Sequence, residues 1–241
     1  MEISGKKSIQ TLIQDPDLKP LIKVIYLSNT QDYLIQLCKE HNTPFEIKNK
    51  AFFDHHYSDK TKYKYKYAIA LLKKQKEITL EQLIEKNKKG VVVILDHLQD
   101  PFNLGAILRT CAAAGVVGVI IPKDKQAPTN HNAVLKASQG YSLKIDIVTV
   151  PNLHRAILTL KKNNYWIYAA ELDKSAKKFR EVEYQPKSAL IMGTEGDGVS
   201  HILKSVSDFL VYIPMQEGID SLNVSVATGI ILFEMTRQIF I

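Results

Sequence analysis

Three stretches of the sequence combine residue types that could hold a ligand or move a proton. The first is the run 96–110, where Asn103 can satisfy free backbone donors and Gly105 permits the close approach of another segment. Within the same run, Arg109 places a guanidinium among apolar and small side chains. A guanidinium in such surroundings needs an anionic partner, which is either an internal carboxylate or a phosphate. The residues alone leave both interpretations open.

Two further stretches lie in the last third of the chain. The segment 191–200 has three glycines within six residues, so its bare backbone can lie against a ligand. It lacks the Lys-Ser/Thr pair of a Walker loop, and its glycine spacing differs from the dinucleotide fingerprint. Farther on, Ser221 and Asn223 are good N-cap residues before a helix whose Ala227 and Gly229 allow close packing. A tight turn and a helix cap would explain the same residues without any ligand.

The sequence does not support metal or thiol chemistry. The two cysteines, Cys38 and Cys111, are far apart, and neither HExxH nor a Cys/His cluster occurs. We therefore expect no metal site, no disulfide framework and a reducing compartment. Cys111 lies in an apolar run, where packing is the better interpretation than nucleophilic attack. The run 54–56, Asp-His-His, matches a phosphoesterase signature, but the further metal-binding aspartates of that class are missing.

The apolar pattern from residue 91 onward predicts the elements that position these stretches. Short apolar runs, typical of strands covered on both faces, alternate with segments of helical periodicity. The predicted strands are 91–95, 116–121, 145–150, 165–170, 189–192 and 209–213. The predicted helices are 103–114, 130–137, 152–162, 200–205 and a long one from about residue 224. The alternation predicts an α/β fold with a mostly parallel sheet, and all three stretches follow strands, where such sheets place ligands.

The domain organisation follows from the same pattern. We expect a small α/β domain over residues 1–75, a lysine-rich linker over 76–90 and the parallel-sheet domain over 91–241. The 241-residue chain has a formal net charge of +7, and residues 1–90 hold 17 Lys against 11 acidic residues. This basic excess favours a polyanion partner, most simply a nucleic acid. The longest apolar runs are too short to cross a bilayer, so we expect no membrane partner and a cytoplasmic location.

One run in the first domain fits an RNA contact. Residues 62–67 alternate Lys with Tyr, so an extended strand would place Lys62, Lys64 and Lys66 on one face and Tyr65 on the other. The lysines could hold phosphates while the tyrosine stacks on an unpaired base. A half-buried strand with solvated lysines would give the same pattern.

Together, the three stretches resemble a known family. D-x-x-x-D-P-x-N-L-G-A-x-x-R-T, then M-G-x-E-G-x-G, then I-P-M with S-L-N-V-S-V-A-T-G, resemble the SpoU class of the SPOUT RNA methyltransferases. More loosely, the first domain resembles the ribosomal-protein-like domain of the large-subunit rRNA guanosine 2′-O-methyltransferase subgroup. The resemblance implies S-adenosylmethionine as methyl donor and a ribose 2′-O-methyl product. It also implies a deep trefoil knot in the α/β domain and a homodimer with the site at its interface.

The resemblance also implies roles for individual residues. Arg109 would be the catalytic arginine, acting near the target ribose and its phosphate, with Asn103 in support. Three further polar residues match family positions around the active site: Glu195, Ser221 and Asn223. Five residues match positions that line or lie beside the cofactor: Gly193, Ile213, Leu222, Met192 and Met215. The chain departs from the subgroup at residues 65–67, where Tyr-Lys-Tyr stands in place of the usual His-Gln-Gly, which leaves the RNA target open.

The sequence thus predicts a ribose 2′-O-methyltransferase that uses S-adenosylmethionine and acts on a guanosine of large-subunit rRNA. A tRNA ribose methyltransferase is the near alternative, because the catalytic motifs are shared. An RNA-binding or ribosome-assembly protein without catalysis is the alternative from another class, although Arg109 and Asn223 are both present. A Rossmann dehydrogenase is a distant third, since the G-x-G-x-x-G pattern is absent after the first predicted strand of the parallel sheet.

Overall fold

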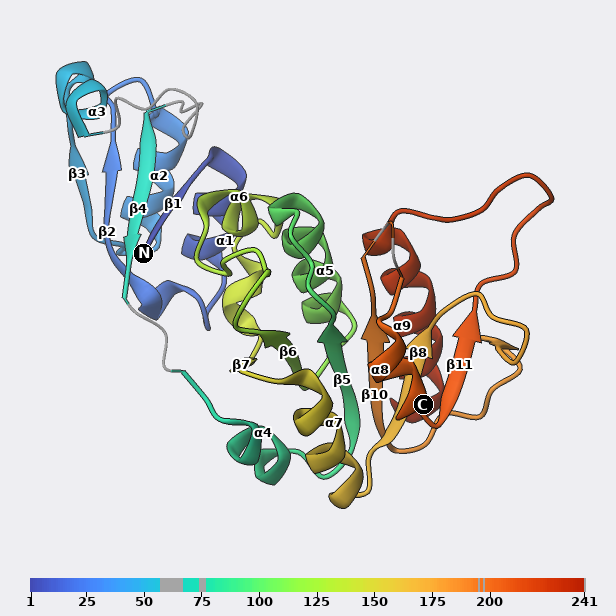
Figure 1. Ribbon diagram of the computed structural model, residues 1–241. Helices are drawn as coiled ribbons and strands as arrows, with labels where there is room; N and C mark the ends of the chain where they lie inside the picture. The colour runs from blue at the N-terminus through green and yellow to red at the C-terminus, as the bar shows by residue number, and fades with distance from the viewer. Residues whose placement is uncertain (57–66, 74–76, 195, 197, 241) are drawn as a thin grey trace. The chain divides into compact units, whose positions relative to one another are not determined.

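The computed structural model divides the chain into two compact units, which are described separately (Figure 1). Unit 1 consists of Met1–Lys76 and Pro128–Lys144, and unit 2 consists of Glu77–Ala127 and Ile145–Ile241. The structure describes residues 1–56, 67–73, 77–194, 196 and 198–240.

Unit 1 is built on a four-stranded mixed sheet. In sheet order, its strands are β1 (Glu2–Ser4), β4 (Ala68–Leu72), β2 (Ile22–Leu27) and β3 (Phe45–Ile47). The β1–β4 and β4–β2 pairs are antiparallel, whereas β2 and β3 are parallel. Its helices are α1 (Lys6–Gln14), η1 (Lys19–Leu21), α2 (Asp32–Glu40), α3 (Lys50–His56), α6 (Asn132–Ala137) and η2 (Tyr141–Lys144). A small α/β unit at the N-terminus therefore exists, as expected.

Residues 128–144 belong to unit 1 although they lie far along the chain. Leu135 and Leu143 are buried in the same apolar core as the β1 and α1 side chains. The Lys144 ammonium lies 2.7 Å from a carboxylate oxygen of Asp15 and 3.0 Å from one of Asp17. This segment lies within residues 91–241, which we expect from the sequence to form the second domain. Helical periodicity shows that a segment buries one face, but it does not show which sheet that face covers.

Unit 2 is built on a seven-stranded sheet in which every described strand pair is parallel. In sheet order, the strands are β7 (Ile147–Val150), β6 (Gly118–Pro122), β5 (Gly90–Leu95), β10 (Lys187–Met192), β8 (Trp166–Ala170), β11 (Phe209–Tyr212) and β9 (Lys177–Lys178). The predicted parallel sheet is confirmed. From β5 the chain runs outward to β6 and β7, then returns to β8 beyond β10, so its direction across the sheet reverses between β5 and β10.

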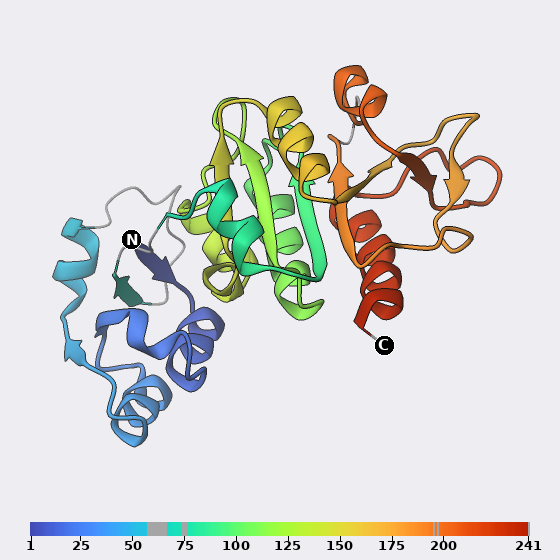
Figure 2. The same cartoon turned by 90° about the horizontal axis from the view of Figure 1, so that it is seen from below.

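Helices lie on both sides of this sheet. They are α4 (Leu80–Lys86), α5 (Pro101–Ala113), α7 (Leu153–Lys162), α8 (His201–Ser205) and α9 (Val224–Phe240). Figure 2 shows α7 and α9 on opposite faces, and α7 contacts β6 and β8 whereas α9 contacts β5 and β10. The expected linker, 76–90, contains α4, which begins in a capping box made by Thr79 and Gln82. In the part of the chain that the structure describes, no helix has the length and apolar character needed to span a bilayer.

Candidate functional site

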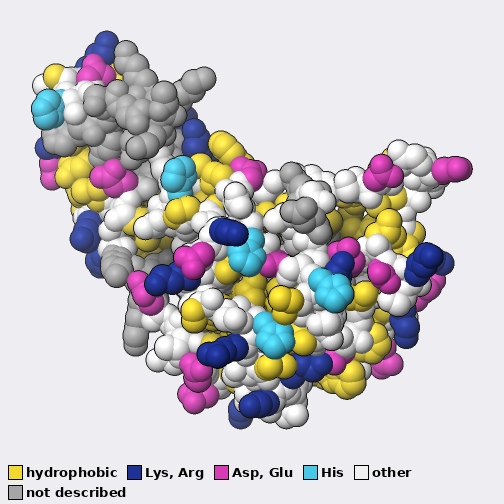
Figure 3. Space-filling model, viewed as in Figure 1, with side chains coloured by type: hydrophobic (Ala, Val, Ile, Leu, Met, Phe, Trp, Pro, Cys, Tyr) yellow, Lys and Arg dark blue, Asp and Glu magenta, His cyan; other side chains and the backbone are white. Residues whose placement is uncertain are grey.

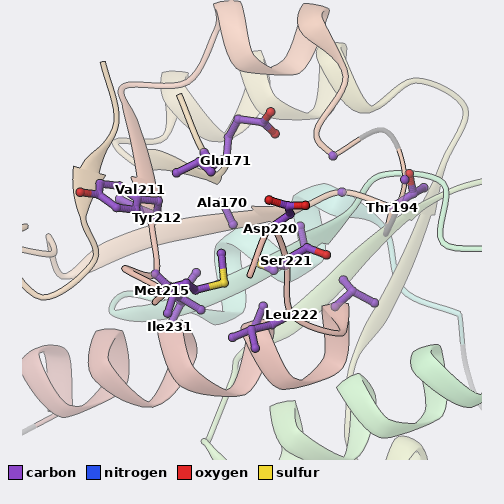
Figure 4. A pocket seen from close by; sticks show the side chains of 18 residues that line it. Ala170, Glu171, Thr194, Val211, Tyr212, Met215, Asp220, Ser221, Leu222 and Ile231 are labelled. Carbon is purple, nitrogen blue, oxygen red and sulfur yellow. The ribbon is translucent and has the colours of Figure 1, made fainter. Parts of the chain in front are cut away.

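A cavity of about 290 Å³ opens at the carboxyl ends of β8, β10 and β11 in unit 2 (Figure 4). Its walls come from the three loops that follow these strands and from the start of α9. The residues that line it are Ala170, Glu171, Leu172, Met192, Gly193, Thr194, Gly196, Gly198, Val211, Tyr212, Ile213, Met215, Asp220, Ser221, Leu222, Val224, Ala227 and Ile231. The structure thus brings all five predicted cofactor residues, and Ser221, to one cavity.

The cavity has an apolar side and a polar side. Figure 4 shows the side chain of Ile231, which belongs to α9, near those of Met215 and Leu222, while the carboxylates of Glu171 and Asp220 lie farther from that helix. Apolar walls with a few polar groups are typical of small-molecule sites, in which the polar groups fix the orientation of the ligand.

The glycine-rich loop after β10 folds tightly on itself. The Thr194 N–H donates to the Gly198 carbonyl at 3.1 Å, and the Gly198 N–H donates back to the Thr194 carbonyl at 3.2 Å. A Cβ atom on Gly193 would lie only 2.0 Å from the Gly198 carbonyl group, and Gly198 itself has φ +64°. Glycine is therefore required at both positions for steric reasons, apart from any ligand.

Two carboxylates hold the end of this loop. The Val199 N–H donates to Glu171 Oε2 at 3.0 Å, and the Ser200 N–H donates to Asp96 Oδ2 at 2.8 Å. Asp96 is the first residue of the D-x-x-x-D-P-x-N-L-G motif, and neither Asp96 nor Glu171 is among the site residues predicted from the sequence. The available signal was that each acid directly follows a predicted strand, at the end of the sheet where ligands bind.

Asn103 and Asn223, two predicted site residues, are in direct contact. Asp100 caps α5 by accepting hydrogen bonds from the N–H groups of Phe102 and Asn103. The Asn223 amide nitrogen then donates to Asn103 Oδ1 at 3.0 Å, while Asn223 Oδ1 accepts from the Ser225 N–H at 2.9 Å. This pair joins the start of α5 to the start of α9, two helices that pack against each other.

Arg109 lies on α5 and is exposed. Its side chain makes no ion pair or hydrogen bond with any residue that the structure describes. Predicted site residue Glu195 lies outside the described residues. The same is true of the predicted RNA-binding residues: Lys62, Lys64, Lys66 and Tyr65.

Both cysteines are buried packing residues. Burial raises the pKa of Cys38 to about 11 and that of Cys111 to about 12, so both thiols stay protonated near neutral pH. A protonated, buried thiol is a poor nucleophile, which agrees with the packing role expected for Cys111. Among the described residues, no group of three or more His, Cys, Asp and Glu side chains is arranged to hold a metal ion.

Comparison with known proteins assigns the chain to a family. The sequence model described as "SpoU rRNA Methylase family" matches residues 90–233. The chain belongs to the SpoU rRNA methylase family. This confirms the resemblance that the three motifs indicate, and the matched residues contain all three of them.

Relatives of known sequence and structure agree with this assignment. The "23S rRNA (guanosine-2′-O-)-methyltransferase RlmB" of Xanthomonas campestris is 45% identical over 163 residues, which cover 67% of this chain and 65% of that protein. The "Uncharacterized tRNA/rRNA methyltransferase MG252" of Mycoplasma genitalium is 39% identical over 218 residues, or 88% of each chain. The crystal structure of the SpoU methyltransferase AviRb from Streptomyces viridochromogenes, in complex with the cofactor AdoMet, has a TM-score of 0.76 at 17% identity, covering 99% of this chain and 90% of that one. This likeness confirms the expected SPOUT fold.

Proposed function

We propose that this protein is an RNA ribose 2′-O-methyltransferase that uses S-adenosylmethionine and acts on a guanosine of large-subunit rRNA. One observation carries the proposal: residues assigned to the cofactor from two separate motifs, which follow β10 and β11, line a single cavity at the carboxyl ends of parallel strands. The family assignment and the name of the Xanthomonas relative support the same reaction and substrate.

The lining of the cavity fits the proposed cofactor chemically. The cavity volume of about 290 Å³ lies just below the roughly 300–1,000 Å³ of small-molecule sites. Gly193 offers bare backbone, and Ile213 and Leu222 offer apolar surface. The Asp220 carboxylate complements the positive charge of a sulfonium and an amino group. S-adenosylmethionine supplies an electrophilic methyl group when bound, so the protein has to align the acceptor hydroxyl and help remove its proton.

The polar residues of the proposed site would supply that help. An exposed guanidinium at Arg109 can bind a ribose oxygen and its neighbouring phosphate, and it stabilises negative charge that develops on the 2′-oxygen. The Asn103–Asn223 hydrogen bond fixes the first turns of α5 and α9. We assign Ser221 and Glu195 to the same site on the family motifs.

The charge distribution supports RNA as the substrate. Unit 1 contains 16 Lys and no Arg against 8 acidic residues, whereas unit 2 contains 16 basic residues against 17 acidic ones. Figure 3 shows basic and acidic side chains interspersed over the visible face of unit 2. The net positive charge of the protein therefore resides in unit 1, to which we assign RNA binding through Lys62, Lys64, Lys66 and Tyr65. We keep the cytoplasmic location as part of the proposal, because rRNA is the expected substrate.

We further propose that the protein is a homodimer through an apolar stripe on α9. Val226, Ile230, Phe233 and Phe240 are exposed at spacings of four, three and seven residues, so they share one side of the helix. Phe102 on α5 is exposed as well. Because α5 and α9 pack together, a second copy can cover both helices at once.

A tRNA substrate is the second candidate, since the name of the Mycoplasma relative covers both tRNA and rRNA. The test is methyl transfer from labelled S-adenosylmethionine to separate pools of protein-free rRNA, protein-free tRNA and ribosomal precursor particles, followed by nucleoside analysis. We expect 2′-O-methylguanosine only in large-subunit rRNA, free or in particles. Labelled nucleoside in tRNA alone would identify tRNA, and not rRNA, as the substrate. Failure to bind the cofactor would favour a non-catalytic RNA-binding protein.

A further inference from the structure

The loop that lines the cavity is held by carboxylates from both neighbouring strands. In the sheet, β10 lies between β5 and β8. Leu95 at the end of β5 is in register with Met192, and Asp96 follows it directly. Ala170 ends β8, and Glu171 follows it in the same way. Each strand beside β10 is therefore followed directly by an acid that can reach the loop after β10.

The two acids accept hydrogen bonds from consecutive backbone N–H groups. Glu171 Oε2 accepts from Val199 at 3.0 Å, and Asp96 Oδ2 accepts from Ser200 at 2.8 Å. The preceding N–H, that of Gly198, donates to Thr194 within the loop. Three successive donors thus have defined partners, and two of these partners are charged acceptors, which form stronger hydrogen bonds than neutral ones.

The other oxygen of each carboxylate is held as well. His97 Nδ1 lies 2.6 Å from Asp96 Oδ1, and Lys204 Nζ lies 3.2 Å from Glu171 Oε1. Asp96 is 4% exposed and the Glu171 side chain 17%, so water competes little for either group. Both oxygens of each carboxylate therefore have a specific contact, which fixes the position of the carboxylate.

We propose that Asp96 and Glu171 are positioning residues that preorganise the end of the cofactor loop, residues 198–200. They hold the loop backbone in the conformation that lines the cavity before any ligand arrives, so that binding does not have to order it. Gly198 takes part in the same arrangement, because a Cβ there would lie 2.6 Å from Glu171 Oε2. This inference rests on the proposed function only in naming S-adenosylmethionine as the ligand.

The experiment compares the full-length protein with Glu171→Ala and Asp96→Ala, which remove the acceptors, and with Glu171→Gln and Asp96→Asn, which keep one acceptor oxygen. We expect each alanine variant to raise the Kd for S-adenosylmethionine by about tenfold or more. We expect the amide variants to restore most of the affinity. At saturating cofactor, kcat of the Asp96 variants should stay close to that of the unmodified protein, because Asp96 does not line the cavity.

Asp208→Ala is a matched control at the opposite end of the strands. Asp208 accepts from the Ile167 N–H at 2.8 Å and from Lys161 Nζ at 2.6 Å, and its side chain is 21% exposed. Its bonding and burial thus parallel those of Glu171. The control should lower the melting temperature comparably and leave the cofactor Kd unchanged. If Glu171→Ala and Asp96→Ala behave like this control, the two acids are merely structural and the proposal is wrong.

Amide hydrogen exchange without cofactor separates this proposal from the proposed function. The N–H groups of Val199 and Ser200 should exchange slowly in the unmodified protein and faster in the alanine variants. Unchanged exchange in those variants would overturn the preorganisation of the loop. If the unmodified protein fails to bind S-adenosylmethionine, the proposed function fails, and exchange alone decides whether the carboxylates order the loop.

Discussion

At the scale of single residues, Arg109 is the sharpest test of the catalytic assignment. Arg109→Ala should lower kcat by about 10²–10³, because the guanidinium would stabilise charge that develops only during transfer. The Kd for S-adenosylmethionine, measured by calorimetry, should stay nearly unchanged, since Arg109 does not line the cavity. Arg155→Ala, at another exposed arginine on α7, serves as the control and should retain activity. A large loss of cofactor affinity in Arg109→Ala would contradict the assigned role.

The glycines of the loop after β10 differ in how much space they have. A Cβ on Gly193 would overlap the Gly198 backbone at 2.0 Å, whereas one on Gly196 would meet no atom within 4 Å. Gly193→Ala should therefore open the loop, lower the melting temperature and abolish cofactor binding. Gly196→Ala is the matched control and should change the melting temperature little. Equal behaviour of the two variants in thermal unfolding would show that the close approach at Gly193 does not hold the loop together.

Six of the residues that line the cavity were predicted from the sequence, whereas the two acids that hold its loop were not. Gly193, Ile213 and Leu222 belong to motifs whose residue types are distinctive in themselves. Glu171, by contrast, bonds to a backbone N–H 28 residues away, and any residue type at 199 other than proline would offer the same donor. A hydrogen bond between a side chain and a backbone N–H does not depend on the residue type of the donor. Such a contact therefore cannot be predicted from the sequence pattern.

At the scale of elements, the apolar pattern predicted the strands and helices of unit 2 well. The predicted strand 189–192 corresponds to β10 and the predicted helix 152–162 to α7, each within a few residues. Two features were not predicted. Helix α4 lies in the supposed linker, and the two-residue strand β9 is too short for any periodicity to reveal. The conformation of a short segment depends on the elements that it packs against in the fold. The apolar pattern of a single sequence does not show these contacts.

The apolar stripe of α9 gives a prediction about assembly. Phe233 is 52% exposed near the middle of the stripe, so Phe233→Glu should place a charge in a dimer interface and produce monomers. Light scattering coupled to size exclusion would measure the mass. Leu158→Glu, at a comparably exposed leucine on α7, is the control and should leave the oligomeric state unchanged. A monomeric unmodified protein, or a dimeric Phe233→Glu variant, would exclude α9 as the dimer contact.

At the scale of the whole molecule, buried acids predict a loss of stability at high pH. Burial raises the pKa of Cys38 from 9.0 to about 11 and that of Cys111 from 9.0 to about 12, and it also raises the pKa values of Tyr165, Tyr168 and Tyr184. Above pH 9 the unfolded chain releases thiol protons that the folded chain retains, so the free energy of unfolding falls as pH rises. The decline should continue until the folded thiols also ionise, at about pH 11 to 12.

Urea unfolding between pH 8 and 10.5 measures this effect. Cys111→Ala should reduce the dependence of stability on pH, even though it lowers the stability itself by leaving a small cavity. Below pH 8 the two proteins should show parallel pH profiles, because neither thiol titrates there in the folded or the unfolded chain. An equally steep alkaline decline in Cys111→Ala would assign the effect to Cys38 and the buried tyrosines instead.

The division of charge between the units predicts how the protein binds RNA. Because unit 1 holds the basic excess, replacing Lys62, Lys64 and Lys66 together by Ala should weaken RNA binding and flatten its salt dependence. Three lost phosphate contacts to single-stranded RNA would lower the slope of log K against log salt by about 2. Replacing Lys88, Lys89 and Lys162 of unit 2 removes the same charge from the molecule. We expect the slope to change in the first variant alone, which would place the phosphate contacts in unit 1. If RNA binding depends only on the net charge of the protein, both triple variants will flatten the slope equally.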